Sequence, residues 1–296
     1  MRPNDLSRWL EGGPRILDGA MGSELLRRGV MSAAKLWGVG ALIEAPQAVQ
    51  ELHRGYAAAG AQALTAATFR VAPYALRRIG VPHRAGELAA LAVRLARAGA
   101  GEAGREALVL ASQTTLEDCY RPDLVPDDAT LAREHALTAV ALAASGADAI
   151  LLETFNTVRE ARVAADAAAS TGLPVVACFT CTAGGKLLSG EDAAEAARAV
   201  RRPGVVAVGV NCTPCAAVAD ALERIAAGAT LPLAAYANNG FAGADAPWLA
   251  ADPIAPAEYG RQAAAWVKLG ARLVGGCCGT GPAHIVAVAS QLARAG

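Results

Sequence analysis

The stretch AASGADAILLE, residues 143–153, indicates the fold more directly than any other part of the sequence. A helical segment leads into Gly146, which suits the left-handed position that closes a helix because it has no Cβ. An apolar run follows and ends at Glu153. The same order recurs in AAAGAQALTA at 57–66 and VKLGARLVGG at 267–276. This repeated junction predicts helices that alternate with buried strands.

The glycines of these junctions are expected to adopt left-handed backbone conformations. Gly60 and Gly270 take the place of Gly146 in the other two stretches. Weaker versions occur at Gly172 and Gly228, where a proline two or four residues later prevents the helix from continuing.

Short apolar runs supply the strands of the predicted fold. None alternates strictly between apolar and polar residues, as expected for parallel strands that are covered on both faces. The runs are PRILDG (14–19), AQALTA (61–66), ALVLAS (107–112), DAILLE (148–153), PVVACF (174–179), VVAVGV (205–210), PLAAYA (232–237) and ARLVGG (271–276). Eight strands that alternate with helices in 296 residues predict a (β/α)₈ barrel, with residues 1–296 as a single domain. A doubly wound open sheet is disfavoured, because LDGAMGSEL (17–25) replaces the G-x-G-x-x-G of dinucleotide-binding folds.

The composition excludes several classes of protein. Hydrophobic residues make up 54% of the chain and charged residues 18%, which is enough apolar material for a large core. The formal net charge is zero, so a non-specific nucleic-acid binder is not expected. The start of the chain resembles no signal peptide, and no segment is apolar enough to span a bilayer, so we expect a cytoplasmic protein. Seven cysteines in such a protein favour buried, metal-binding or catalytic thiols over disulfides.

Polar residues at the carboxyl ends of the predicted strands are the candidates for a site, since barrel enzymes place their chemistry there. In chain order they are Asp18, Thr65, Gln113, Glu153, Cys178, Thr180, Asn211, Cys212, Asn238, Cys277 and Cys278. The four histidines (His53, His83, His135 and His284) fall in predicted helices or loops, and we interpret them as structural.

The segment GGCCGTG, residues 275–281, suggests a metal site. Neighbouring side chains on a regular strand point to opposite faces, so the flanking glycines must let the backbone leave the strand if Cys277 and Cys278 are to share one ion. Cys212 offers a third thiolate at another strand end. Three thiolates suit Zn²⁺ and leave its fourth tetrahedral position open for a substrate.

Two other interpretations of these residues remain open at this point. Most cysteines are simply buried, and Gly275–Gly281 before the last helix is compatible with a phosphate cradle, as in a barrel lyase or isomerase. The spacing C-x-x-C of Cys212 and Cys215 is also found in redox pairs, although Cys212 is better employed on a metal. We assign no site role to Cys119, Cys178 or Cys181.

The segments LDGAMGSEL (17–25), GVNCT (209–213) and GGCCGT (275–280) resemble those of the homocysteine S-methyltransferase family. Further matches are LEDCYRPDLVPDD (116–128), ILLETFNT (150–157), YANNG (236–240) and WVKLGARLVGGCCGTGPAHI (266–285). The resemblance implies a barrel in which Cys212, Cys277 and Cys278 bind zinc. It also implies that Asp18 and Glu153 contact the amino group of the substrate, with Asn211 and Thr65 as further substrate contacts.

The implied reaction is methyl transfer to homocysteine, which gives methionine. A zinc-bound thiol is deprotonated, and its sulfur would attack the methyl group of S-methylmethionine or S-adenosylmethionine. We expect a sulfonium donor, because a folate or cobalamin route would need further domains or a partner protein. Two alternatives remain. The acceptor could be another thiol or a selenol, or the chain could be a homocysteine-binding module that works with a cobalamin or folate partner.

The sequence departs from the family pattern in two places. Ala67 stands in TAATF (65–69) where the family often has an asparagine, and ASQTTLEDCY (111–120) replaces a turn that commonly contains Gly or Pro. We expect both segments to border the pocket. The long loop from Asn238 to Pro256, with Trp248, is a candidate lid.

Overall fold

The computed structural model of this chain describes residues 1–30, 37–240 and 253–295. Its main sheet has eight parallel strands, which coincide with the eight predicted runs. The strands are β1 (Arg15–Ile16), β2 (Ala63–Ala66), β3 (Leu108–Gln113), β4 (Ala149–Phe155), β5 (Val175–Phe179), β8 (Val205–Pro214), β9 (Leu233–Asn238) and β10 (Ala271–Gly276). A small antiparallel hairpin, β6 (Cys181–Thr182) with β7 (Lys186–Leu187), follows β5.

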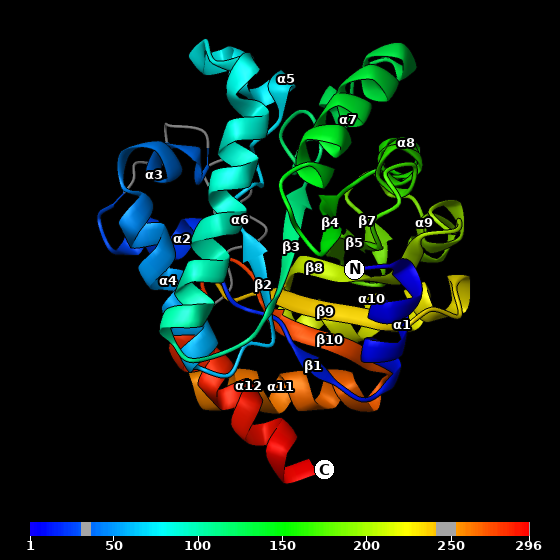
Figure 1. Cartoon of the computed structure of the whole chain (residues 1–296). Coiled ribbons are helices and arrows are strands. Elements are labelled where there is room, and N and C mark those ends of the chain that lie inside the picture. Colours follow the sequence, from blue (N-terminus) through cyan, green and yellow to red (C-terminus); the bar gives the residue numbers. More distant parts are fainter. Residues whose placement is uncertain (31–36, 241–252, 296) are drawn as a thin grey trace.

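The sheet closes on itself. Its strand order is β1-β10-β9-β8-β5-β4-β3-β2, and a parallel bridge between Leu17 and Ala63 joins the two ends. At this seam the backbone N–H of Asp18 donates to the carbonyl of Ala63 at 3.1 Å, and that of Gln62 donates to Ile16 at 2.8 Å. Helices surround the strands (Figure 1). The predicted (β/α)₈ barrel is confirmed, and the single domain spanning 1–296 stays a prediction.

The helices cover the outside of the barrel, apart from the first, whose Leu6 and Leu10 belong to the inner core. They are α1 (Pro3–Glu11), α2 (Gly22–Arg27), α3 (Val39–Glu44), α4 (Pro46–Ala58), α5 (Pro73–Leu76), α6 (Ala85–Glu102), α7 (Asp128–Ala143), α8 (Val158–Ala169), α9 (Ala193–Ala199), α10 (Val218–Gly228), α11 (Pro256–Lys268) and α12 (Pro282–Ala295). Four short 3₁₀ segments, η1 (Arg77–Ile79), η2 (Pro82–Arg84), η3 (Pro122–Leu124) and η4 (Cys215–Ala217), occupy loops. No helix in these described ranges is both long and apolar enough to cross a membrane.

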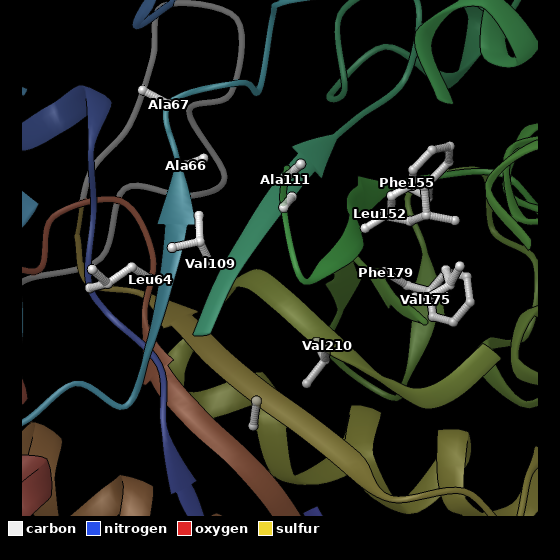
Figure 2. Close-up of a cluster of buried hydrophobic side chains, with 14 of the residues drawn as sticks. Leu64, Ala66, Ala67, Val109, Ala111, Leu152, Phe155, Val175, Phe179 and Val210 are labelled. Atoms are coloured by element: carbon white, nitrogen blue, oxygen red, sulfur yellow. The ribbon is translucent and has the colours of Figure 1, made fainter. Parts of the chain in front are cut away.

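Two apolar cores hold the barrel together. The outer core lies between sheet and helices, and Figure 2 shows strand side chains of it such as Leu64, Val109 and Leu152. The inner core fills the barrel, where Leu110 and Leu151 meet Leu6 and Leu10 of α1. Helix α1 thereby plugs one end of the barrel and leaves the carboxyl ends of the strands for a site.

The junction glycines mostly behave as predicted. Left-handed φ angles occur at the expected positions: Gly60 (104°), Gly146 (85°), Gly172 (81°) and Gly270 (102°). The prediction for Gly228 is wrong, because this residue is the last of α10 and has no positive φ. A Cβ there would collide with the backbone of Ala194 in α9, so close helix packing explains this glycine. Trp248 and most of the candidate lid lie outside the described residues.

Candidate metal centre

The barrel brings Cys212, Cys277 and Cys278 together. Their Sγ atoms all lie within 4.8 Å of one another, although 65 positions separate the first two in sequence. Cys212 lies near the end of β8, and the other two follow β10. Cys212 is 2% exposed, and Cys277 and Cys278 are partly exposed, so the cluster faces inward and remains accessible from one side.

The end of β10 shows how two adjacent cysteines reach one point. The strand ends at Gly276, so Cys277 and Cys278 lie in a turn that Gly279 completes with a φ of 79°. The glycines before them have a different purpose from the predicted one. A Cβ on Gly275 would approach the carbonyl oxygen of Asp18 to 2.6 Å, and one on Gly276 would collide with Thr280. These two glycines therefore allow close packing, and Gly279 supplies the turn.

The end of β8 presents Cys212 by another route. The register against β9 shifts between Asn211 and Pro214, so β8 carries an extra residue there, which is a β-bulge. Cys212 itself has a φ of 48°, a strained value for a residue with a side chain. Its Sγ lies 3.0 Å from the hydroxyl of Tyr120 and accepts a long hydrogen bond of 3.8 Å from Nδ2 of Asn238.

The three thiols influence one another's protonation. Hydrogen bonds with Cys277 and Cys278, supported by Tyr120, lower the pKa of Cys212 well below its usual value. The hydrogen bond with Cys212 raises the pKa of both Cys277 and Cys278. The protonation of each thiol therefore depends on that of the other two.

The cluster fits the requirements of a soft metal ion. Three convergent sulfur atoms supply thiolate ligands, and the described residues add no fourth His, Cys or carboxylate to the group. Three protein ligands with an open position characterise catalytic sites, whereas structural zinc sites have four. The remaining cysteines, Cys119, Cys178, Cys181 and Cys215, lie outside the group. Cys215 Sγ instead donates to the carbonyl oxygen of Asn238 at 3.6 Å.

The glycine-rich segment does not form a phosphate cradle. Such a cradle needs backbone N–H groups that are free to donate to the ligand. Here Gly276 donates to Asp18 at 2.9 Å, Gly279 to the Ser23 hydroxyl at 2.9 Å, and Gly281 to Nδ1 of His284 at 3.1 Å. Because the protein satisfies these donors itself, the geometry disfavours the phosphate-binding alternative.

Asp18 lies at the barrel seam, where β1 meets β2. It is 2% exposed, and its Oδ2 accepts the backbone N–H of Thr65 at 2.8 Å. Burial, with a contribution from nearby Glu153, raises its pKa well above the usual range. Thr65 thus holds Asp18 in place through its backbone.

Glu153 lies near the end of β4 inside the barrel. Oε1 accepts a short hydrogen bond from the hydroxyl of Ser112, and Oε2 accepts one of 3.3 Å from the hydroxyl of Tyr236. Burial raises the pKa of this carboxyl to about 7, and the charge of Cys212 contributes to the rise. A buried carboxylate that two hydroxyl donors hold in place is suited to bind an ammonium group.

Asn211 lies directly before Cys212 and is fully buried. Its Oδ1 accepts the backbone N–H of Thr154 at 2.7 Å, and its Nδ2 donates to Thr154 Oγ1 at 2.9 Å. Both ends of the amide are therefore bound within the protein. The structure places Asn211 as a link between β8 and β4, whereas the sequence suggested a contact with substrate.

Gln113 turns away from the site, although Ser112 and Tyr120 of the same segment contact Glu153 and Cys212. Strand alternation directs Ser112 into the barrel and Gln113 outward toward α7. Gln113 Nε2 bonds Nδ1 of His135 at 2.9 Å, and Nε2 of His135 bonds Glu160 at 3.1 Å. Ala67 is likewise buried in the outer core (Figure 2). Gln113 therefore shapes the packing of the helices.

The other histidines lie outside the cysteine group. His53 is fully buried in α4, where burial lowers its pKa to about 3, and His83 is exposed. His284 in α12 contacts Nδ2 of Asn239 at 3.0 Å, close to the cysteine turn. None of the four belongs to the cysteine group within the described chain.

Four contacts of the site escaped the sequence analysis: Ser112, Tyr120, Thr154 and Tyr236 touch Glu153, Cys212 or Asn211. Strand alternation was the available signal for Ser112, which lies beside the strand-end residue Gln113 and points the opposite way. Tyr120, Thr154 and Tyr236 lie within the family-like segments LEDCYRPDLVPDD, ILLETFNT and YANNG, but no pattern or spacing distinguishes them from their neighbours there.

Comparison with known proteins agrees with this geometry. The family model described as homocysteine S-methyltransferase matches residues 15–292. The chain is 30% identical to homocysteine S-methyltransferase of Escherichia coli, over 93% of this chain and 94% of that protein. It is 28% identical to homocysteine S-methyltransferase 4 of Zea mays, over 96% of this chain and 91% of that one. It is also 31% identical to methionine synthase of Mycobacterium tuberculosis, over 84% of this chain but only 22% of that protein.

A solved structure has the same fold along nearly the whole chain. The metallated form of the homocysteine methyltransferase MmuM from Escherichia coli aligns with a TM-score of 0.81 and 29% identity, over 94% of this chain and 96% of that one. The range matched by the family model, 15–292, contains Cys212, Cys277, Cys278, Asp18 and Glu153, and the resemblance inferred from sequence is confirmed. This chain therefore belongs to the homocysteine S-methyltransferase family.

Proposed function

We propose that this protein transfers a methyl group from a sulfonium donor to homocysteine at a Zn²⁺ ion held by Cys212, Cys277 and Cys278. The convergence of three Sγ atoms within 4.8 Å of one another carries the proposal. Zinc bound there would keep the substrate sulfur deprotonated and nucleophilic at neutral pH.

The choice of zinc follows from the ligand chemistry. Thiolates select soft ions such as Zn²⁺ over Mg²⁺ or Ca²⁺, which prefer oxygen ligands. Zinc has no redox chemistry to disturb three thiolates, and it accepts a fourth ligand in a tetrahedral arrangement. The open position would receive the substrate sulfur. The existence of a metallated form of the related MmuM supports a bound metal.

Homocysteine fits the groups that surround the cysteines. Glu153 and Asp18 are buried carboxyl groups inside the same end of the barrel, and each is held by donors of the protein. An ammonium group between them would gain charge-assisted hydrogen bonds and relieve the cost of burying the acids. We propose that they orient the amino end of the substrate, while Thr65 and Asn211 hold the scaffold around them.

A sulfonium donor makes no demand on the site for a proton donor. The leaving group departs as a neutral thioether and needs no protonation. The Tyr120 hydroxyl lies against Cys212 and that of Tyr236 against Glu153, so both are engaged with the site. Either S-methylmethionine or S-adenosylmethionine meets this requirement.

A second candidate function follows from the similarity to one part of a larger protein. The chain matches only 22% of the methionine synthase of Mycobacterium tuberculosis. A homocysteine-binding module that receives its methyl group from a cobalamin- or folate-carrying partner is therefore the alternative. Its signature would be homocysteine binding without turnover of sulfonium donors.

The decisive experiment is a methyl-transfer assay with homocysteine as acceptor. Purified, reduced protein is incubated with S-methylmethionine, S-adenosylmethionine or methylcobalamin, with and without a chelator, and methionine is measured. We expect turnover with one sulfonium donor, loss with chelator and recovery with added Zn²⁺. Turnover that survives complete metal removal would contradict the proposal, and turnover with methylcobalamin alone would favour the second candidate.

A further inference from the structure

Two strands of the barrel bulge at the same level. The register of β4 against β5 shifts between Leu152 and Phe155, so β4 has one extra residue beside Glu153. The register of β8 against β9 shifts between Asn211 and Pro214, beside Cys212. Bulges of this kind redirect side chains next to active sites.

Each bulge contains a strained residue. Thr154 has a φ of 63° and Cys212 one of 48°, and they are the two non-glycine residues with positive φ in the described ranges. Such a value is unusual for any side chain and a marked outlier for the β-branched Thr154. Strain of this kind persists only where the surroundings impose it, and it concentrates at functional sites.

The two bulges are bound directly to each other. Strands β4 and β8 are not neighbours, because β5 lies between them in the sheet. Two hydrogen bonds nevertheless join them: Thr154 N–H to Asn211 Oδ1 at 2.7 Å, and Asn211 Nδ2 to Thr154 Oγ1 at 2.9 Å. All four atoms are buried and the bonds are reciprocal. We call this pair the Thr154–Asn211 clamp.

The clamp stands between two groups that the substrate would bridge. Glu153 directly precedes Thr154, and Cys212 directly follows Asn211. We propose that the Thr154–Asn211 clamp sets the span between the Glu153 carboxylate and the Cys212 sulfur, and thereby selects homocysteine over the shorter amino-acid thiol cysteine. This inference rests on the proposed function, since it takes Glu153 as the ammonium site and Cys212 as a metal ligand.

The physical reason is that a substrate held at both its amino group and its sulfur binds well only if its length matches the distance between the two binding groups. Homocysteine exceeds cysteine by one methylene, and a rigid span rewards the longer molecule only while both ends are held. One methylene can be worth roughly 10–200-fold in discrimination, and a displacement of about 1 Å can cost about 100-fold in rate. A loosened clamp would let the span vary, and the preference for the longer thiol would shrink.

Three variants isolate the clamp. Asn211→Ala removes both hydrogen bonds. Thr154→Val keeps the shape and branching of the side chain but removes the Oγ1 acceptor, and Thr154→Ser restores that acceptor. All three leave Glu153 and the three cysteines unchanged, so they test positioning alone.

The measurement is thiol binding and turnover in parallel. The Co²⁺-substituted proteins are titrated with homocysteine and with cysteine, and the change in cobalt absorption yields Kd for each thiol. Zinc-loaded proteins supply kcat and KM for the same two acceptors. We expect Asn211→Ala and Thr154→Val to lose roughly tenfold or more of the homocysteine-to-cysteine preference while still binding one metal, and Thr154→Ser to keep it.

Each result decides the proposal. An unchanged preference in metal-loaded Asn211→Ala and Thr154→Val overturns the clamp, as does an equal loss for both thiols, which a purely structural role would produce. If Asn211→Ala does not fold, the Val and Ser variants decide. If the clamp variants lose the Kd preference for homocysteine but the wild type transfers no methyl group, only the proposed function is overturned. Absence of thiol binding to wild-type Co²⁺ protein overturns both.

Discussion

The ends of β8 and β10 deliver cysteines to the same point by opposite means. At β10 the backbone is relaxed, since Gly275 and Gly276 lack a Cβ and let β1 and Thr280 pack closely. At β8 the backbone is strained at Cys212, and the side chain of Asn211 holds the bulge through Thr154. A strained residue of this kind costs about 1–3 kcal/mol.

The difference teaches where the precision of the site originates. The end of β10 depends on the absence of a Cβ at Gly275 and Gly276, where β1 and Thr280 fill the space. The β8 end depends on a contact with β4, so its geometry is linked to that of Glu153. One end is therefore sensitive to added volume and the other to lost hydrogen bonds. The following changes separate the two.

The largest effect is expected from Cys277→Ser, which breaks the metal centre from the β10 side. A serine hydroxyl is a poor ligand for a soft ion, so bound zinc should fall from about one per chain to nearly none, and methyl transfer should fall to background. Metal analysis and the assay measure both. Cys215→Ser is the matched control, because this thiol lies outside the cluster. Full zinc occupancy in Cys277→Ser would refute the assignment.

A smaller but pH-dependent effect is expected from Glu153→Gln on the β4 side. Burial raises the pKa of Glu153 from 4.5 to about 7, so the folded protein holds its proton more tightly than the unfolded chain. Its contribution to stability is present below pH 4.5 and is lost as the pH rises through about 7, by about 3 kcal/mol. Glu153→Gln has no titrating carboxyl at this position, so it does not lose this stability as the pH rises.

The check is denaturant unfolding of metal-free, reduced wild type and Glu153→Gln at pH 5 and pH 8. Relative to wild type, the variant should gain stability between the two values. In wild type, the KM for homocysteine should fall as the pH rises through about 7, because the ammonium group needs the carboxylate. A stability difference that does not change with pH would rule out Glu153 as the titrating group.

Asn211→Ala should destabilise the β8 end by about 2 kcal/mol. The change leaves the buried N–H of Thr154 without an acceptor, and such a group costs about 1–3 kcal/mol. Chemical denaturation measures the loss. Because the strain at Thr154 is no longer compensated, we also expect faster amide exchange at the ends of β4 and β8 than at the end of β10. If amide exchange in Asn211→Ala is equally fast at the ends of β4, β8 and β10, the β8 end does not depend on the clamp more than the β10 end does.

The smallest of these effects is expected from Gly276→Ala on the β10 side. The added Cβ would collide with Thr280, and overpacking of this kind costs about 1–3 kcal/mol unless that side chain can move. We expect the free energy of unfolding to fall by about 1 kcal/mol, which thermal unfolding measures. We also expect weaker metal binding, which competition with a chelator measures. Gly101→Ala in α6 is the control, since nothing lies near its Cβ and its stability should stay equal or rise. Identical behaviour of both variants would disprove the packing role.

Much of the fold could be predicted because its signals are local. The eight apolar runs, the left-handed Gly60, Gly146 and Gly270, and the departure of Cys277 from its strand all follow from neighbouring residues. Gly228 misled because a glycine required for contact between two helices has the same one-letter pattern as one that closes a helix. Gln113 misled because its place at a strand end did not reveal that its side chain points outward to His135 of α7.

The sequence by itself determined the barrel, the family and the identity of the clustered cysteines, because periodicity, junction glycines and short motifs are properties of adjacent residues. Only the tertiary structure decided how the groups are held: the seam between Leu17 and Ala63, the Ser112 and Tyr236 donors on Glu153, and the Thr154–Asn211 clamp. These contacts join residues tens of positions apart or more. Their geometry depends on the closure of the barrel, and no local pattern of the chain encodes that.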